Sequence, residues 1–141
     1  MGGMAPLKTK GDTAEMMVAA DLVKRGYRIA FPYGEDSDYD LIVERDGRLE
    51  RIQVKYTESR NGVIELRCKS HSLTNGKVRS VKRYTAKTIE WLAVYDRVTD
   101  RCYYVPAVEL GEGRERMHLR LQPTLSGRKL GINWASDYLE I

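Results

Sequence analysis

The segment from Asp40 to Tyr56 constrains the fold of this chain more than any other. It consists of two stretches of alternating apolar and polar residues, separated by Asp46-Gly47. An Asp-Gly pair between two such stretches is typical of a two-residue β-hairpin turn, because both turn positions need a positive φ. We therefore expect a hairpin over residues 40–56.

The turn also predicts the register of the two strands. Counting outward from it places Asp40 directly opposite Gln53. Opposed side chains lie on the same face of a sheet, with their Cβ atoms about 5 Å apart. Because side chains alternate along a strand, Lys55 joins Asp40 and Gln53 on that face. The other face is apolar and consists of Leu41, Val43, Ile52 and Val54.

A helix is expected over residues 12–25. Asp12 and Glu15 have the spacing of a capping box, and Gly26 supplies a stop signal. In the purely structural interpretation, the Glu15 side chain reaches back to cap the start of the helix. At 100° per residue, however, Glu15 falls in the apolar arc of the helix. A carboxylate directed toward the sheet favours the alternative that Glu15 belongs to a functional site.

The size and composition of the chain predict an ordinary globular protein. Its 141 residues, 42% hydrophobic and 31% charged, indicate a single domain over residues 1–141. No apolar run approaches the roughly 20 residues that a membrane-spanning helix needs, and the start has no signal-peptide core. Cys68 and Cys102 form no Cys-x-x-Cys pair, which is typical of buried thiols. These features predict a soluble, cytoplasmic protein that makes no membrane contact.

Positive charge is concentrated in one part of the chain. The net charge of +4 is only weak support for a polyanionic partner, but no acidic residue occurs between Glu65 and Glu90. We interpret this stretch as a basic loop that could follow phosphates, and the alternative is a solvated surface loop. Tyr56 and Tyr84 are the aromatic residues expected to contact nucleic acid. The basic residues expected to do so are Arg67, Lys69, Lys77, Arg79, Lys82 and Arg83.

The rest of the chain is predicted to form short elements. Extended segments are expected near residues 27–33, 63–68, 91–96, 101–105 and 117–121. Tyr84–Glu90 is expected to be a short helix, Pro106–Leu110 a helical turn, and 123–131 a loop. A second basic cluster is interrupted by Glu115 and gives weaker support for nucleic-acid binding. Its members are Arg114, Arg116, Arg120, Arg128 and Lys129.

The order of the polar residues resembles the PD-(D/E)XK nuclease superfamily. A Glu on the first helix precedes an Asp that opens a strand and an acid-or-amide-x-Lys on the next strand, here Glu15, Asp40 and Gln53-Val54-Lys55. The chain most resembles the small endonucleases associated with group I introns, whose second motif also carries Gln. It is more distantly similar to archaeal Holliday junction resolvases. One departure is that Tyr39, not Pro, precedes Asp40.

The resemblance implies an α/β, restriction endonuclease-like fold, with a mixed, mainly antiparallel central sheet flanked by helices. It also implies a metal-dependent DNA endonuclease that uses Mg²⁺, with Mn²⁺ as the other possibility. The implied catalytic residues are Glu15, Asp40, Gln53 and Lys55. The implied metal ligands are Asp40, Gln53, the Val54 backbone carbonyl and Glu15. Such oxygen ligands suit Mg²⁺, which can activate water and offset charge on a phosphate.

The implied partner is DNA, either duplex or branched. Because a small domain has one active centre, cutting both strands implies at least a homodimer, and the intron-type relatives imply that a homotetramer is also possible. An intron-type enzyme would cleave a long duplex sequence, whereas a resolvase would prefer four-way branched DNA. A third alternative is a nucleic-acid-binding module whose nuclease fold no longer cleaves. The sequence leaves all three alternatives open.

Overall fold

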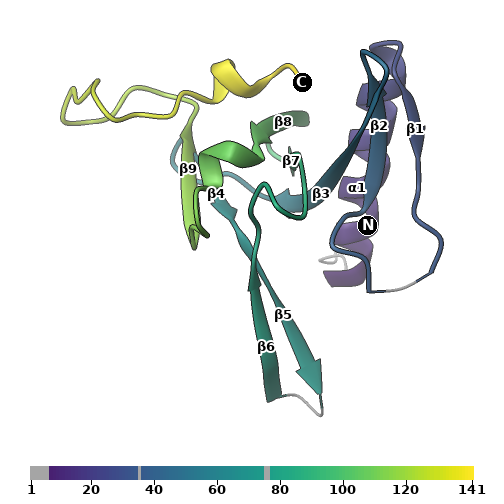
Figure 1. Ribbon diagram of the computed structural model, residues 1–141. Helices are drawn as coiled ribbons and strands as arrows, with labels where there is room; N and C mark the ends of the chain where they lie inside the picture. Colours follow the sequence, from purple (N-terminus) through teal and green to yellow (C-terminus); the bar gives the residue numbers. More distant parts are fainter. Residues whose placement is uncertain (1–6, 35, 75–76) are drawn as a thin grey trace, which may run out of the picture.

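A central sheet forms the middle of the molecule. The computed structural model describes residues 7–34, 36–74 and 77–141 (Figure 1). The strands of the sheet are β1 (Arg28–Ala30), β2 (Leu41–Arg45), β3 (Arg48–Thr57), β7 (Trp91–Asp96) and β8 (Arg101–Pro106), arranged in the order β1-β2-β3-β7-β8. β3 and β7 run parallel, and the other neighbours run antiparallel. The sheet is therefore mixed and mainly antiparallel, as predicted.

The hairpin of β2 and β3 has the predicted register. Leu41 pairs with Ile52, and the turn residues Asp46 and Gly47 have φ values of 49° and 76°. Positive φ at both positions is what a two-residue turn of this kind requires. The backbone N–H of Asp40 donates to the Ile52 carbonyl at 2.8 Å, so Asp40 also faces Ile52, and the predicted pair of Asp40 with Gln53 is not part of the ladder. The local turn signal was sufficient to place the two strands.

The helix α1 (Leu7–Lys24) begins earlier than predicted. Asp12 lies inside it, so the predicted Asp12–Glu15 capping box is wrong. The Thr13 hydroxyl donates to the Thr9 carbonyl at 2.7 Å, one turn earlier, as side chains inside a helix do. The polar turn before Asp12 has no strong local signal for a helix. It is helical because it extends the later turns of α1, which pack on the sheet.

Buried side chains form clusters on both faces of the central sheet. Along β7, Ala93 and Tyr95 join one cluster, whereas Leu92 and Val94 join the other. α1 covers the first cluster and buries Ala14, Val18 and Leu22 against the apolar face of the hairpin. The second is covered by β4 (Val63–Arg67), β9 (Arg116–Arg120), η1 (Ala107–Leu110) and η2 (Ala135–Tyr138). β4 and β9 pair as a separate antiparallel ribbon.

The basic segment is a β-hairpin, so the prediction of a loop is wrong. β5 (Lys69–Thr74) pairs with β6 (Lys77–Arg83) in antiparallel register. Figure 1 shows the two strands leaving the body of the molecule together as a long arm. An Asn-Gly pair stands between the two stretches in the sequence, and this hairpin signal outweighs the high charge. We call residues 69–74 and 77–83 the arm.

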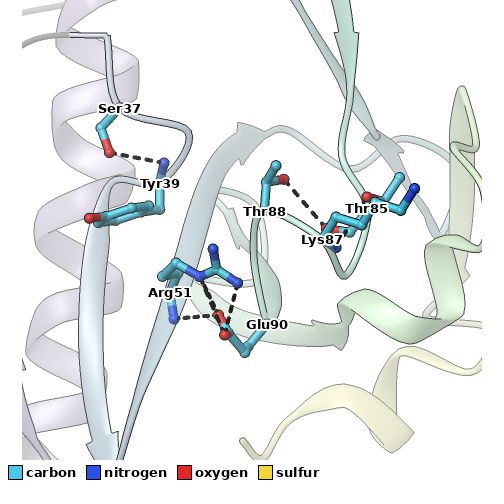
Figure 2. Close-up of polar contacts among 7 residues, drawn as sticks. All are labelled: Ser37, Tyr39, Arg51, Thr85, Lys87, Thr88 and Glu90. Atoms are coloured by element: carbon cyan, nitrogen blue, oxygen red, sulfur yellow. Dashed lines mark hydrogen bonds and ion pairs between the residues drawn. The ribbon is translucent and has the colours of Figure 1, made fainter.

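The segment Tyr84–Glu90 is not the predicted helix. It forms a turn at residues 86–88 and leads from the arm to β7 (Figure 2). The backbone N–H and the hydroxyl of Thr88 both donate to the Thr85 carbonyl, at 3.2 and 3.4 Å. The Glu90 carboxylate accepts the backbone N–H of Arg51 at 2.8 Å and its guanidinium at 2.9 and 3.0 Å (Figure 2). Hydrogen bonds between side chains and the backbone, such as those of Thr88 and Glu90, compete with the backbone hydrogen bonds of a helix.

The remaining predicted elements agree with the structure. The strand pair of β7 and β8, the helical turn η1, the loop at 123–131 and the strands β4 and β9 are confirmed, with small differences in their ends. The extended segment near 27–33 contains only the short β1. Among the residues that the structure describes, no helix combines the length and the apolar character needed to cross a membrane.

Candidate active site

The residues predicted to form a site lie at the end of the β2–β3 hairpin that is remote from its turn. Asp40 immediately precedes β2, Gln53 and Lys55 lie on β3, and Glu15 comes from α1. All four side chains are half-buried. α1 packs on the apolar face of the hairpin, and this packing brings Glu15 to the end of β2. The fold thus joins a helix residue to a pair of strand residues.

The carboxyl groups of Glu15 and Asp40 interact directly. Burial, followed by the charge of Asp40 and a hydrogen bond to its carboxylate, raises the pKa of Glu15 from 4.5 to about 7. The charge of Asp12 has a smaller effect in the same direction. The neighbouring carboxylate thus favours the protonated form of Glu15. Glu15 therefore faces the site and does not cap the helix.

Asp40 is held in place by the backbone of β3. Its Oδ2 accepts the Val54 N–H at 2.9 Å, while its own N–H donates to the Ile52 carbonyl. These two bonds orient the carboxylate at the edge of the hairpin. Within the described residues, no N–H group contacts the second carboxylate oxygen. One oxygen of Asp40 is thus structural, and the other is available to Glu15 or to a cation.

Lys55 lies in a partly enclosed environment. Its Nζ donates to the Lys69 carbonyl at 3.3 Å and lies 5.1 Å from the centroid of the Tyr84 ring. Burial lowers the pKa of Lys55 and the charge of Arg67 lowers it slightly, whereas the Asp40 carboxylate opposes both. An amine with a lowered pKa exchanges a proton with water more readily near neutral pH. The base of the arm thus holds this lysine through the Lys69 carbonyl, while burial lowers its pKa.

The donor set suits a hard divalent cation. Burial and the Asp40 carboxylate favour the protonated form of Glu15, and a bound cation would favour its charged form instead. The Gln53 amide nitrogen donates to the Val54 carbonyl at 3.5 Å, so these two groups are adjacent. Oxygen donors of this kind fit Mg²⁺ or Mn²⁺. The described residues contain no group of three or more His, Cys, Asp and Glu, so any ion would depend on the amide and backbone oxygens as well.

The basic residues predicted to contact DNA fall into different environments. Arg67 is exposed and lines, together with Lys55, an open pocket of about 460 Å³. Lys69 and Arg83, at the base of the arm, pair with Glu115 at 3.7 and 2.9 Å. These two are therefore partly neutralised, whereas Arg67 has no ion-pair partner within the described part of the chain.

The other basic residues of the arm contribute less to the picture of the site. Lys82 pairs with Asp38 at 3.0 Å, and both side chains are exposed. The side chains of Lys77 and Arg79 lie outside the described residues, although their backbone belongs to β6. The Lys82–Asp38 pair links the arm to the loop that leads to Asp40.

The two tyrosines expected to contact nucleic acid differ in exposure. Tyr84 is only 5% exposed and belongs to the core beneath Lys55, so the structure contradicts its prediction as a stacking residue. Its ring supports the lysine instead. Tyr56 is half-buried, with its ring centroid 6.2 Å from that of Tyr95 and the Lys10 Nζ 5.5 Å away. Its accessible edge remains beside the pocket that Lys55 lines.

Sequence reasoning missed three acidic or basic neighbours of the site. Asp38 and Glu115 hold the arm through their ion pairs, and Lys10 of α1 pairs with Glu58 at 3.4 Å just beyond β3. The acidic spacing of Asp38 and Asp40 was a usable signal for the first. Nothing local connects Glu115 or Lys10 to the site, because only the fold brings them near it.

Comparison with known proteins identifies a family for this chain. A model of the family described as PD-(D/E)XK endonuclease matches residues 6–141. Protein 5.3 of Escherichia phage T7 is 40% identical over 45 residues, covering 32% of this chain and only 38% of that protein.

A solved structure extends the likeness to the fold. The bacterial homing endonuclease I-Ssp6803I matches with a TM-score of 0.75 and 20% sequence identity, covering 95% of this chain and 88% of that one. This similarity confirms the predicted restriction endonuclease-like fold, with its mixed α/β architecture. Because the family model spans nearly the whole chain, the protein belongs to the PD-(D/E)XK endonuclease family.

Proposed function

We propose that this protein is a metal-dependent DNA endonuclease in which Glu15, Asp40, Gln53 and Lys55 are the catalytic residues. One observation supports this most: the half-buried carboxyl of Glu15 meets that of Asp40 close to the half-buried amine of Lys55, and burial raises the pKa of Glu15 and lowers that of Lys55. Like charges pushed together at a half-buried position are unfavourable for stability and are typical of active sites. Membership of an endonuclease family agrees with this chemistry.

The proposed cofactor is Mg²⁺, with Mn²⁺ as the alternative. Glu15, Asp40, the Gln53 amide oxygen and the Val54 carbonyl would hold it. A bound divalent ion supplies a water of lowered pKa and positive charge for the phosphate oxygens. Because Gln53 stands where a second carboxylate would add negative charge, affinity in the free protein is expected to be modest.

The side chains have distinct parts in the proposed reaction. Val54 N–H and the Ile52 carbonyl orient Asp40, so its carboxylate needs little reorganisation when substrate binds. The Lys69 carbonyl and the Tyr84 ring hold the Lys55 amine. From this position Lys55 would orient the attacking water or offset the negative charge that develops on the phosphate.

The proposed DNA contacts surround this centre. Arg67 lines the same pocket as Lys55. Lys82 and the base-of-arm residues Lys69 and Arg83 would meet phosphates by exchanging their carboxylate partners for DNA, as exposed ion pairs do at little cost. The arm would then lie along the duplex. Tyr56 would contact the DNA only at its accessible edge.

The proposed substrate class is a site-specific duplex, as for a homing-type enzyme. The similarity of the fold to a homing endonuclease over 95% of the chain favours it. A structure-specific Holliday junction resolvase is the alternative enzyme, and a binding module that no longer cleaves is the alternative of a different class. These alternatives differ in the DNA that the protein cleaves, or in whether it cleaves at all.

The test combines substrates, metals and isosteric variants. Supercoiled plasmid and a four-way junction are incubated with purified protein, with Mg²⁺, with Mn²⁺ or with chelator. Asp40→Asn removes the charge but keeps an oxygen for the Val54 N–H, and Lys55→Met removes the amine but keeps most of its bulk. We expect a loss of cleavage of at least about a hundredfold in each variant.

Glu44→Gln is the matched control, because Glu44 is an exposed carboxylate on the same hairpin. It should cleave at the wild-type rate. Preference for the junction would assign a resolvase, and cleavage that survives in Asp40→Asn would remove the proposed site. If no DNA is cleaved but duplex binding persists, a screen of randomised targets distinguishes a demanding recognition sequence from a binding module.

The assembly is proposed to be a homodimer or a homotetramer. Each chain offers one centre of this kind among the described residues, whereas a double-strand break requires two cuts. Sedimentation of the active protein, with and without duplex, measures its mass. Efficient cutting of both strands by a species that stays monomeric on DNA would contradict this proposal.

A further inference from the structure

The ribbon of β4 and β9 has a basic outer face. Side chains on both strands of the ribbon alternate between its two faces. Those that point into the core are Ile64, Leu66, Met117 and Leu119, so the residues between them point outward. Arg67 and Arg116 lie directly opposite each other on that outer face, and Glu65 is the acidic residue on it. We call the outward residues the ribbon face; they are Val63, Glu65, Arg67, Arg116, His118 and Arg120. Figure 1 shows the ribbon at the margin of the molecule, well away from β1 and α1.

Further arginines extend this charge. Arg114, Arg116, Arg120 and Arg128 line one open pocket of about 590 Å³ on the ribbon face. The Arg120 guanidinium donates to the Gln122 and Pro123 carbonyls at 3.1 and 3.3 Å, and that of Arg128 donates to the Leu130 carbonyl at 3.0 Å. These bonds hold the cations in fixed positions without neutralising them. Arg114, Arg120 and Arg128 have no ion-pair partner within the described part of the chain.

Glu115 does not interrupt this face as the sequence suggested. Its carboxylate turns to the base of the arm, where it pairs with Arg83 and Lys69. The carboxylate that does meet the face is Glu65, at 3.4 Å from Arg116. The Arg116 side chain nevertheless stays 60% exposed. The face therefore carries a clear excess of positive charge.

The ribbon face is continuous with the candidate active site. Val63 and His118 line both the arginine pocket and the pocket that contains Lys55 and Arg67. The backbone phosphates of a DNA strand bound at Lys55 could thus pass Arg67 and continue across the ribbon face. At about 3.3 Å per residue, Arg116 to Arg120 spans about 13 Å, which corresponds to roughly four nucleotides along a duplex axis.

We propose that the ribbon face, extended by Arg114 and Arg128, binds the phosphodiester backbone of the DNA substrate beside the pocket that Lys55 lines. The duplex is then held by the ribbon as well as by the arm. This inference rests on the proposed function, because it assumes that DNA is the ligand. It adds a contact surface that does not belong to the catalytic residues.

Binding is tested with the wild-type chain in chelator, so that no cleavage occurs, using a fluorescein-labelled duplex of arbitrary sequence. The double variant Arg114→Gln, Arg116→Gln removes two exposed charges and no core contact. We expect its dissociation constant to rise about tenfold, and the slope of log K against log salt to decrease by about two, since each phosphate contact contributes about 0.9. Fluorescence anisotropy at several salt concentrations measures both.

Two further variants make the test specific. Glu65→Gln removes the carboxylate from the face and should tighten binding about two- to threefold, an effect that misfolding would not produce. Arg48→Gln, in the exposed position after the hairpin turn, removes one positive charge outside the face and should leave binding unchanged. Equal weakening per removed charge by Arg48→Gln and by the double variant would overturn the proposal, since only net charge would then matter.

The cleavage assay separates this inference from the proposed function. If wild type cleaves DNA and the double variant binds with the wild-type affinity and salt slope, the inference fails while the proposed function stands. If the double variant and Glu65→Gln shift binding in opposite directions but wild type cleaves nothing, the surface is supported and the proposed cleavage fails.

Discussion

At the scale of single residues, the chemistry of the site depends on which groups the fold desolvates. Glu15 and Lys55 have ordinary side chains, but burial raises the pKa of one and lowers that of the other. Both shifts bring the groups closer to neutral pH, where proton transfer is efficient. Asp40 opposes the shift of Lys55 and reinforces that of Glu15. This one carboxylate therefore couples the helix to the strand.

The raised pKa of Glu15 predicts a stability that decreases with pH. The folded protein keeps the Glu15 proton to about pH 7, whereas the unfolded chain releases it near 4.5. The folded state binds more protons between these values, so the free energy of unfolding falls as pH rises through this window. Allowing for solvent screening of a half-buried group, we expect a fall on the order of 1–2 kcal/mol.

Urea unfolding in chelator, at about pH 5 and about pH 8, measures this fall. Glu15→Gln should abolish it, because the amide does not titrate. Glu44→Gln, on an exposed part of β2, should keep it. A Glu15→Gln variant with the wild-type pH dependence would show that the coupling to Asp40 is negligible.

At the scale of elements, local signals decide some structures and mislead in others. The Asp46-Gly47 turn and the glycine stop of α1 are predicted correctly, because each depends on a few adjacent residues. The segment at 84–90 is not, since its turn depends on the bonds that Glu90 makes to Arg51 across the sheet. The high charge of the arm likewise favours the prediction of a loop, which is wrong. Its two strands are stabilised by pairing with each other, and amino-acid composition does not indicate that pairing.

The end of α1 gives a matched pair of glycine predictions. Gly26 has a φ of +91°, and the Tyr27 N–H donates to the Leu22 carbonyl at 3.1 Å, as in a Schellman cap. No atom lies within 4 Å of a Cβ added at Gly26 or at Gly11. Gly26→Ala should therefore cost about 1 kcal/mol through backbone strain alone, whereas Gly11→Ala, inside the helix, should stabilise by about 0.5–1 kcal/mol.

Urea unfolding of the two variants checks these opposite signs under identical conditions. Because each adds one methyl group to open space, differences in packing cancel. A Gly26→Ala variant as stable as wild type would mean that the cap relaxes out of the left-handed conformation.

At the scale of the whole molecule, the central sheet is shared by the cores on both of its faces. Leu22, under α1, and Leu119, on the ribbon, are both fully buried, yet they lie on opposite sides of the sheet. Since each core needs the same strands, loss of one should remove the support of the other. The proposed catalytic residues come from α1 and from the β2–β3 hairpin, and the proposed DNA surface depends on the ribbon side.

This arrangement predicts one cooperative unfolding transition. Leu22→Ala and Leu119→Ala should each lower the free energy of unfolding by about 2–4 kcal/mol, through lost burial and an internal cavity. In both variants, far-UV circular dichroism and tryptophan fluorescence should give coincident urea transitions. The fluorescence reports on Trp91 in β7 and on Trp134, which bridges to Arg120 beside the ribbon. Separate transitions would mean that the two sides fold independently.

The sequence by itself determined the hairpin and its register, because turn chemistry and the two-residue period of a strand act locally. The same local rules place Gln53 and Lys55 on one face of β3, because they lie two residues apart on one strand. Only the tertiary structure decided that Glu15 meets Asp40, that Tyr84 lies beneath Lys55, and that Glu115 turns away from the ribbon face. These contacts join segments distant in sequence, and burial and packing, rather than local propensity, bring such segments together.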